Sequence, residues 1–290
     1  MAAYLQSQDY AAFGLPATTT PAQANAATRL IDGRIGKPDG LLWSPDAFGN
    51  PAWMTNKTAT RSYVAATATT PGLNTITIKN ANFGFGDIGA CVLIDRAGTP
   101  ESGIISEASG NTITVTTTQP HAAGATLEFG MAIAEDAPVR HGRVQTLASP
   151  LVAVLGVTGS YQGCRQGRSN YLDWVDQIVG TGLAGTIWNP FPPSQCDIDP
   201  TTGTCTLLPG TVRGGFSRVR LQYIAGWNYT NLPLAIKQAC ANLILAMMNS
   251  EMPTNIKMQK DGDAEQVSFN SSLFDTDTEN LITSYRTIRL

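Results

Sequence analysis

Residues 218–250 read RVRLQYIAGWNYTNLPLAIKQACANLILAMMNS, and this stretch decides the fold class. Its first part alternates the apolar Val219, Leu221 and Tyr223 with polar neighbours, and this period of two predicts a half-buried strand. Its second part, opened by residues 231–233 (Asn-Leu-Pro), carries apolar residues at helical spacing as far as about Ser250. A strand followed by a long helix predicts a fold that combines both kinds of element.

The predicted helix is apolar around almost its whole circumference. One stripe consists of Ile236, Cys240, Leu243 and Met247, and much of the other side consists of Leu234, Ala241, Leu245 and Met248. A helix of this kind lies in the centre of a core or between subunits. Pro253 ends it, and the polar residues 259–269 that follow indicate a hairpin or an arm.

Two further helices are predicted nearer the ends of the chain. Thr20 before Pro21 is typical of a helix N-terminus, and Gly36 marks its end. Between them, residues 41–54 contain prolines, glycines and large aromatics, which indicates an ordered loop. A last helix is predicted from Thr276, where Thr276 and Glu279 have capping-box spacing. Its apolar face consists of Leu281, Ile282, Tyr285 and Ile288.

Residues 63–129 are rich in Thr and β-branched residues and predict five short strands. These centre on residues 76–78, 91–94, 104–105, 113–115 and 127–129, and together they predict a small barrel or sandwich. A second β-rich stretch covers residues 144–158, whereas the pattern of residues 171–179 fits a strand or a short helix. The predicted fold class is therefore α+β, with a discontinuous core of residues 1–62 and 131–290 and an inserted all-β module of residues 63–130.

Composition excludes several classes of function. Charged residues make up 14% of the 290 residues and the net charge is −3, which argues against a dedicated nucleic-acid binder. There is no long apolar run for a membrane span, and the N-terminal residues do not form a signal peptide, so we expect a protein that stays in the cytoplasm where it is made. In that reducing compartment, Cys196 and Cys205 are expected to be free thiols, although they flank a turn that a disulfide could close.

Catalytic patterns are sparse. His121 and His141 are the two histidines, and neither belongs to a metal-binding or nucleophile motif. The carboxylates of residues 197 and 199 lie on a turn that lacks the other ligands of a calcium loop. The sequence therefore predicts no enzyme activity, no catalytic residues, no metal and no cofactor.

The C-terminal third resembles the head–tail connector (adaptor) family of long-tailed bacteriophages. The resemblance begins with a strand ending Tyr-Ile-Ala-Gly-Trp at residues 223–227, followed by Leu232-Pro233, the long helix, a Gly-Asp pair at residues 262–263 and Tyr285-Arg286. Two earlier segments also resemble the family: the helix segment 27–34 (ATRLIDGR) and the strand 149–157 (SPLVAVLGV). The matching segments cover about half the chain in the family's order, but family members are usually shorter and lack the inserted module.

This resemblance implies a structural virion protein of the phage neck, made in the host cytoplasm. Copies of the chain, a dodecamer in this family, would form a ring beneath the portal protein, meet a tail terminator or other neck protein, and extend the channel through which DNA passes. The residues expected to dock on the portal are Leu281, Tyr285, Arg286, Ile288 and Arg289. Those expected between neighbouring copies are Leu234, Leu245 and Met248. The alternative for each of these residues is the monomer's own core.

A second hypothesis comes from the aromatic residues near the β module. Trp43, Trp53 and Trp188, with polar residues nearby, would also suit a carbohydrate-binding or structural protein of the tail or baseplate.

Overall fold

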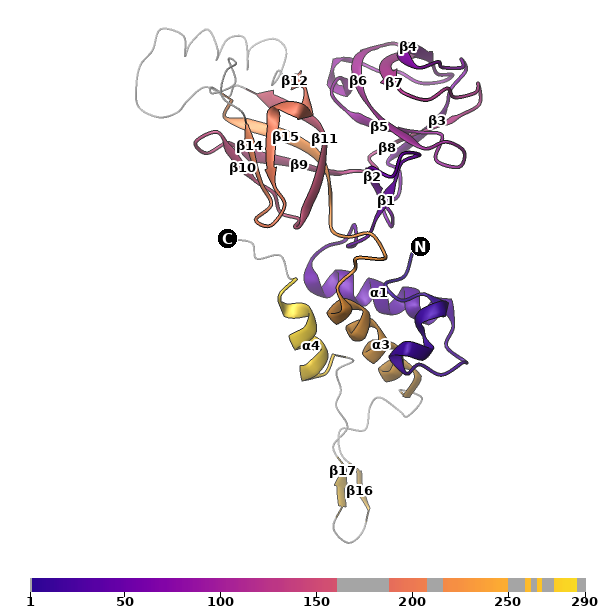
Figure 1. Ribbon diagram of the computed structural model, residues 1–290, viewed down its shortest axis with the longest axis vertical. Coiled ribbons are helices and arrows are strands. Elements are labelled where there is room, and N and C mark those ends of the chain that lie inside the picture. The colour runs from indigo at the N-terminus through magenta and orange to yellow at the C-terminus, as the bar shows by residue number, and fades with distance from the viewer. Residues whose placement is uncertain are drawn as a thin grey trace. The chain divides into compact units, whose positions relative to one another are not determined.

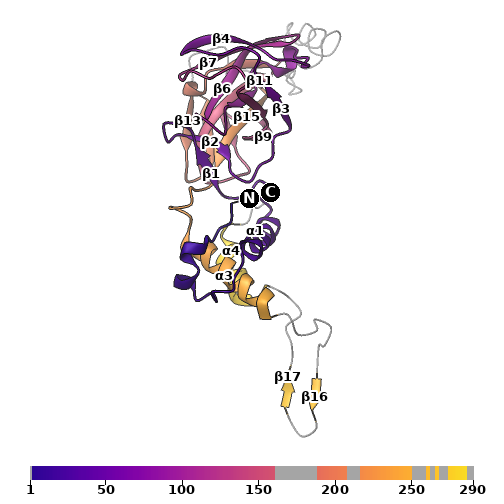
Figure 2. The ribbon, with the colours of Figure 1, turned by 90° about the vertical axis from the view of Figure 1, so that its right-hand side faces the viewer.

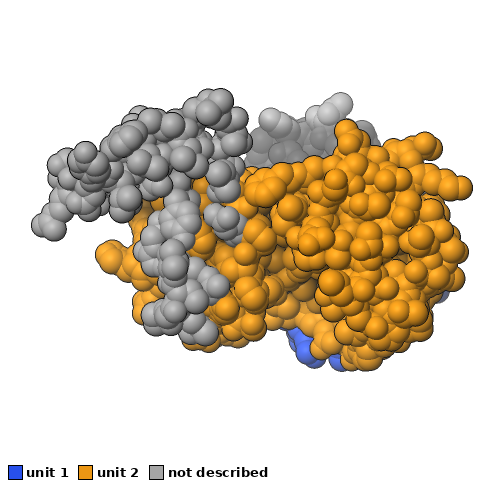
Figure 3. All heavy atoms as spheres, turned by 90° about the horizontal axis from the view of Figure 1, so that it is seen from above, with its two compact units in different colours: residues 1–42, 227–290 blue, residues 43–226 orange. Residues whose placement is uncertain are grey.

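The computed structural model describes residues 2–160, 188–207, 216–249, 259–261, 265–267 and 274–285. Within these residues the fold is α+β, as predicted, and consists of three α-helices and several antiparallel sheets (Figure 1). The chain forms two compact units: residues 1–42 with 227–290, and residues 43–226. Figure 3 shows these units in different colours.

The first unit is helical. Helices α1 (Pro21–Ile35), α3 (Leu234–Asn249) and α4 (Thr276–Thr283) lie against one another (Figure 2). Two 3-10 turns, Ser7–Asp9 and Ala11–Phe13, precede them. The buried core that the helices share with the N-terminal segment includes Tyr4, Leu5, Ala27, Ile31, Ile35, Ile236, Cys240, Leu243, Ile244 and Ile282. Because the first and last parts of the chain contribute to one core, they fold as one unit.

The predicted starts of α1 and α4 are both confirmed, but the capping residue of α4 is Asp275 and not the predicted Thr276. At α1, the Thr20 side chain accepts a hydrogen bond from Gln23 N–H and the Gln23 side chain accepts one from Thr20 N–H, which forms a capping box. At α4, the N-cap is Asp275, whose carboxylate accepts a hydrogen bond from Thr278 N–H at 2.7 Å. An ionised Asp at this position also interacts favourably with the helix dipole.

The second unit contains the predicted β module as a curled six-stranded antiparallel sheet, in the order β3-β8-β5-β6-β7-β4. Its strands are β3 (Arg61–Val64), β4 (Gly72–Thr77), β5 (Cys91–Ile94), β6 (Glu101–Ser109), β7 (Thr112–Thr117) and β8 (Thr126–Phe129). A bridge between Ala65 and Ile78 joins the segments beyond the two edge strands, which accounts for the curl. The five predicted strands are confirmed, and β3 is the strand that the sequence did not predict.

A four-stranded antiparallel sheet in the same unit contains the strand predicted from the alternation of Val219, Leu221 and Tyr223. Its order is β12-β11-β15-β9, with β9 (Ile133–Pro138), β11 (Leu151–Ser160), β12 (Asn189–Phe191) and β15 (Arg218–Ala225). The half-buried character of β15 is confirmed, because Val219, Leu221 and Tyr223 are fully buried while Arg218 is exposed. The same unit contains a three-stranded sheet in the order β10-β14-β13, with β10 (Arg143–Gln145), β14 (Thr204–Leu207) and β13 (Cys196–Asp199).

Two short hairpins complete the description. The loop predicted for residues 41–54 is wrong, because β1 (Trp43–Pro45) and β2 (Pro51–Met54) pair there as antiparallel strands. Strands β16 (Gln259–Asp261) and β17 (Glu265–Val267) form the hairpin that the polar segment after α3 indicated. Residues 171–179, predicted as a strand or a helix, lie outside the described residues.

The compact units follow a different division from the predicted domains. Both large sheets belong to the unit of residues 43–226, so the predicted module of residues 63–130 is grouped with strands assigned above to the connector core. Whether the module is an insertion into a smaller ancestral fold stays a prediction.

Candidate functional site

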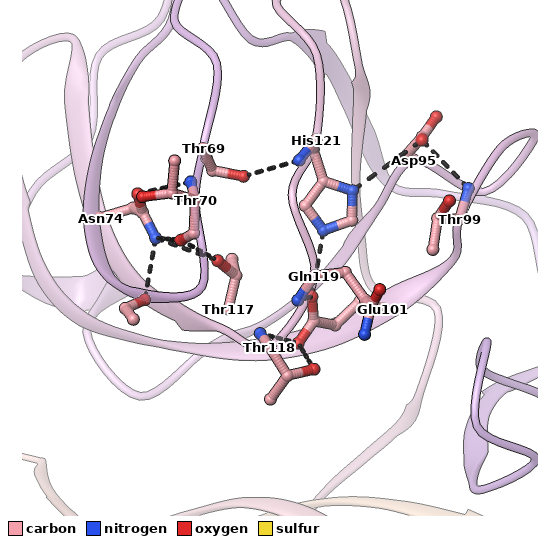
Figure 4. Close-up of polar contacts among 11 residues, drawn as sticks. Thr69, Thr70, Asn74, Asp95, Thr99, Glu101, Thr117, Thr118, Gln119 and His121 are labelled. Atoms are coloured by element: carbon pink, nitrogen blue, oxygen red, sulfur yellow. Dashed lines mark hydrogen bonds and ion pairs between the residues drawn. The ribbon is translucent and has the colours of Figure 1, made fainter.

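The most extensive buried polar cluster of the β module centres on Glu101, at the start of β6. Its carboxylate accepts hydrogen bonds from Thr118 N–H at 2.6 Å, the Thr118 hydroxyl at 2.7 Å and Gln119 N–H at 3.1 Å (Figure 4). The fourth partner is His121 Nε2, at 3.0 Å. The side chain of Glu101 therefore holds the connection between β7 and β8 against the start of β6.

His121 lies between two carboxylates. Its ring points from the β7–β8 connection toward Glu101 on one side and Asp95 on the other (Figure 4). The Nδ1 atom lies 3.8 Å from Asp95 Oδ2 and makes no hydrogen bond. The backbone of His121 pairs with that of Thr69, with N–H···O distances of 2.9 and 3.2 Å. The ring is thus fixed by strands from distant parts of the sequence.

The environment of Glu101 favours its ionised form. Burial alone would raise its pKa, but the hydrogen bonds from Thr118, His121 and Gln119 outweigh burial and hold the pKa below its usual value. Hydrogen bonds to an ionised carboxylate are stronger than those between neutral groups, so the four donors to Glu101 stabilise this part of the module.

The contacts of this cluster hold the β module together. The side chain of His121 is 1% exposed, so a substrate does not reach its ring nitrogens. No group of three or more His, Cys, Asp or Glu side chains among the described residues has the arrangement of a metal site. Its charged hydrogen bonds attach the connection between β7 and β8 to the start of β6.

A second buried polar cluster lies in the helical unit. The Tyr4 hydroxyl donates to the Asp32 carboxylate and accepts a hydrogen bond from Leu41 N–H at 2.9 Å, and Tyr4 N–H donates to Thr28 Oγ1 at 3.0 Å. The pKa of Asp32 is raised to about 7. Burial is the main cause, the charge of Asp39 adds to the increase, and the hydrogen bond from Tyr4 acts in the opposite direction. This cluster fixes the N-terminal segment on α1.

The three residues predicted to contact neighbouring copies differ in their exposure. Leu234, at the first position of α3, is 71% exposed, whereas Leu245 and Met248 are half-buried against the helical core. For Leu245 and Met248 the monomer's own core therefore accounts for part of their apolar surface, while Leu234 is free to contact another molecule.

The residues predicted to dock on the portal fall into two groups. Leu281 and Tyr285 are half-buried and pack on the helical core, where the Tyr285 ring meets the Trp227 ring edge to face with 5.6 Å between centroids. Arg286, Ile288 and Arg289 lie outside the described residues. The structure thus places Leu281 and Tyr285 in the helical core, with Tyr285 against Trp227, which precedes α3.

The aromatic residues of the carbohydrate hypothesis do not form an open platform. Trp53 is 8% exposed, and the Arg96 guanidinium lies 5.9 Å from its ring centroid. Trp43 packs at the edge of a small core, and the Trp188 ring is covered by the Arg220 guanidinium at 4.4 Å. Sugar rings stack on exposed aromatic faces, so these positions give that hypothesis little support.

The two cysteines of the β13–β14 hairpin are free thiols. Cys205 is fully buried, and a hydrogen bond from Cys196 lowers the pKa of its thiol even though burial opposes this. No helix among the described residues is long and apolar enough to cross a membrane.

Sequence reasoning identified His121 but missed Glu101 and Asp95 as its partners. Both acids are 20 or more positions away, Glu101 in β6 and Asp95 just after β5, so no local motif joins them to His121. The available signal was Glu101 at the head of a β-branched strand, since a carboxylate at a strand position that faces a core needs donors nearby. No known protein-family model matches the chain, and no curated protein matches it.

Proposed function

We propose that the chain is a structural subunit of a bacteriophage neck, which forms a ring that joins the portal to the tail and extends the DNA channel. The support comes from the sequence resemblance together with the positions of the segments that carry it. Portal, tail terminator and further copies of the chain are the proposed partners, and the proposed location is the virion neck.

The observation that carries the proposal is that the resembling segments form neighbouring pairs within each unit. In the helical unit, the segment 27–34 belongs to α1, which packs on α3 through buried Ala27, Ile31, Ile236 and Cys240. In the other unit, β11 and β15 pair along almost their whole length, with Val157 opposite Leu221. Motifs scattered over half the chain thus meet as pairs, as expected if they derive from one ancestral core.

The exposed Leu234 provides a surface for a neighbouring copy. It begins α3 directly after Pro233, and it is 71% exposed, whereas Ile236 and Cys240 of the same helix are fully buried. In the proposed ring, this side chain would lie in the head-to-tail contact between neighbouring copies.

The proposal is tested by mass photometry of the purified protein, alone and mixed with its portal ring. We expect a discrete increase in mass on mixing, and we expect Leu234→Glu to abolish or weaken ring formation because it places a charge in the contact between copies. Leu73→Glu is the matched control, because Leu73 is 70% exposed on the edge strand of the β module. A compact trimer indifferent to the portal would overturn the proposal and favour a tail or baseplate protein.

Docking on the portal is tested separately with Arg286→Glu/Arg289→Glu. These substitutions leave the described helical core unchanged, so the protein is expected to fold but to lose the increase in mass with the portal. Arg29→Glu on α1, combined with Lys79→Glu on the β module, reverses the same number of charges at other exposed positions. Equal loss in both double variants would show a general effect of charge and would argue against a docking role for the C-terminal arginines.

A further inference from the structure

The turn between β9 and β10 (Figure 1) is a tight two-residue turn with a basic sequence, Arg140-His-Gly-Arg143. Arg140 N–H donates to the Arg143 carbonyl and Arg143 N–H to the Arg140 carbonyl, both at 2.9 Å. The two central residues, His141 and Gly142, have φ values of 52° and 74°. Positive φ at both central positions is the conformation of a type I′ turn.

Two features of this turn oppose folding. A type I′ turn favours Asn, Asp or Gly at its first central position, and His141 is less well suited to the left-handed conformation that it adopts there. Arg140 and Arg143 are direct cross-strand partners, and like charges in this arrangement repel. A sequence selected for folding alone would place other residues at these positions, so the basic side chains point to a role outside the fold.

The turn is also firmly held and open to solvent. The Gly142 carbonyl accepts a hydrogen bond from Leu207 N–H at 2.8 Å, and Val139 N–H donates to the Ser217 carbonyl at 3.0 Å. Arg140, His141 and Arg143 are all exposed. The backbone is therefore fixed by β14 and by the residue before β15, while the side chains remain accessible.

In the part of the chain that the structure describes, charges on the surrounding strands neutralise the basic residues near the turn only in part. Arg218 is exposed and pairs in register with Pro138, which adds a third guanidinium beside the turn. Of the nearby acids, Asp136 is held by Arg220 at 2.7 Å and also interacts with the charge of Arg218. Asp197 lies two strands from Arg143 in register, roughly 10 Å away. Among the described residues, no ion pair forms at Arg140, Arg143 or Arg218.

We propose that Arg140, Arg143 and Arg218 contact the phosphate backbone of duplex DNA. The choice of DNA rests on the proposed function, which places this polymer in the channel of the ring. Guanidinium groups bind phosphate oxygens in a bidentate manner, and phosphate contacts need only charge and geometry. Protein interfaces instead depend on central aromatic or apolar anchors, and residues 140–143 include none. The net charge of −3 opposes binding to DNA, so we expect a weak contact for each copy, which a ring would multiply.

The test is binding of a fluorescent duplex DNA of random sequence to the isolated protein, followed by anisotropy over a range of salt concentrations. We expect salt-sensitive binding by the unchanged protein. Arg140→Gln/Arg143→Gln should weaken it and decrease the slope of log K against log salt by about two, one for each phosphate contact removed. Arg29→Gln/Lys79→Gln removes two exposed positive charges elsewhere and should leave the slope unchanged.

His141→Asn separates the turn from its charge, because Asn adopts the left-handed conformation readily. This variant should fold at least as well as the unchanged protein and retain the salt slope that the arginines produce. Absence of DNA binding by the unchanged protein, or equal slopes in the two double variants, would overturn the inference. Loss of the portal mass increase by Arg140→Gln/Arg143→Gln with DNA binding intact would also overturn it and identify an acidic protein as the partner. The neck proposal itself is judged by the unchanged protein with the portal, so the two failures are distinguishable.

Discussion

The side-chain amide of Gln222 in β15 hydrogen-bonds to the backbone of Cys91 in β5, which lies 131 positions earlier in the chain. Cys91 N–H donates to Gln222 Oε1 at 2.6 Å, and Gln222 Nε2 donates to the Gly89 carbonyl at 3.0 Å. One side chain thus supplies a donor and an acceptor to the backbone of the six-stranded sheet from the four-stranded sheet. The contact is close, since a Cβ added at Gly89 would lie 2.4 Å from Thr158 Cγ2 of β11.

Replacing Gln222 by Leu should destabilise the second unit by about 1–3 kcal/mol, because the backbone groups of residues 89 and 91 lose their partners while shielded from water. Urea unfolding measures this change. Gln238→Leu is the control, because Gln238 is exposed on α3 and, among the described residues, its side chain bonds only to Asn242, four residues on, a contact of about 0.2–0.5 kcal/mol. Equal effects of the two substitutions would contradict a joining role for Gln222.

Glu101→Gln should destabilise the β module by about 1–3 kcal/mol at neutral pH, because a charged acceptor of four hydrogen bonds becomes a neutral amide with its own donors. The pKa of Glu101 is lowered in the folded protein, so its stabilisation is present above its unfolded pKa and is lost as the pH falls through the folded value. Urea unfolding across the acidic range should therefore show a smaller loss of stability in the variant than in the unchanged protein. Parallel curves would contradict this account.

Because the pKa of Asp32 is raised, we expect this group to give the opposite pH dependence of stability, with a loss as the pH increases. Its folded pKa is about 7, above the usual value of 3.8, so the folded state binds more protons than the unfolded state between these values. Stability attributable to this group is therefore greatest below the unfolded pKa and falls as the pH rises toward 7. Asp32→Asn keeps an acceptor for the Tyr4 hydroxyl and should remove this decline.

The size of the Asp32 effect is on the order of a few kcal/mol, at about 1.4 kcal/mol for each unit of pKa difference. Thermal unfolding between weakly acidic and neutral pH measures it. Asp277→Asn is the control, because Asp277 is exposed in the first turn of α4. A decline that persists in Asp32→Asn would assign the pH dependence to another group.

The elements that could be predicted from the sequence are those with a local signal. Ile113 and Val115 alternate with threonines in β7, and Thr20 with Pro21 marks the start of α1, so period and capping were enough. Strand β3 was missed because three of its four residues are exposed and it has no apolar alternation. The β1–β2 hairpin was missed because the prolines at its strand ends resemble loop residues.

The candidate site was less predictable than the fold, for a physical reason. His121 lies in the connection between β7 and β8 and Glu101 begins β6, so their hydrogen bond joins positions that no local sequence pattern relates. The Arg140–Arg143 pair is local, but its importance depends on the positive φ values of the two residues between them. The chemistry of such contacts can be recognised only when the path of the backbone is known.

The start of α4 offers the sharpest comparison between the sequence prediction and the structure. The sequence pattern placed the cap at Thr276, whereas the structure places it at Asp275, whose carboxylate accepts the hydrogen bond from Thr278 N–H. Asp275→Ala should therefore cost about 1 kcal/mol of stability, a typical loss for an N-cap. Thr276→Ala should cost much less, because Thr276 is the first helical residue and is exposed. Thermal unfolding of the two variants side by side measures the difference. Because Ile282 of α4 is buried in the helical core, loosening of α4 should lower the melting temperature of the helical unit. A larger loss for Thr276→Ala than for Asp275→Ala would show that the helix begins one residue later.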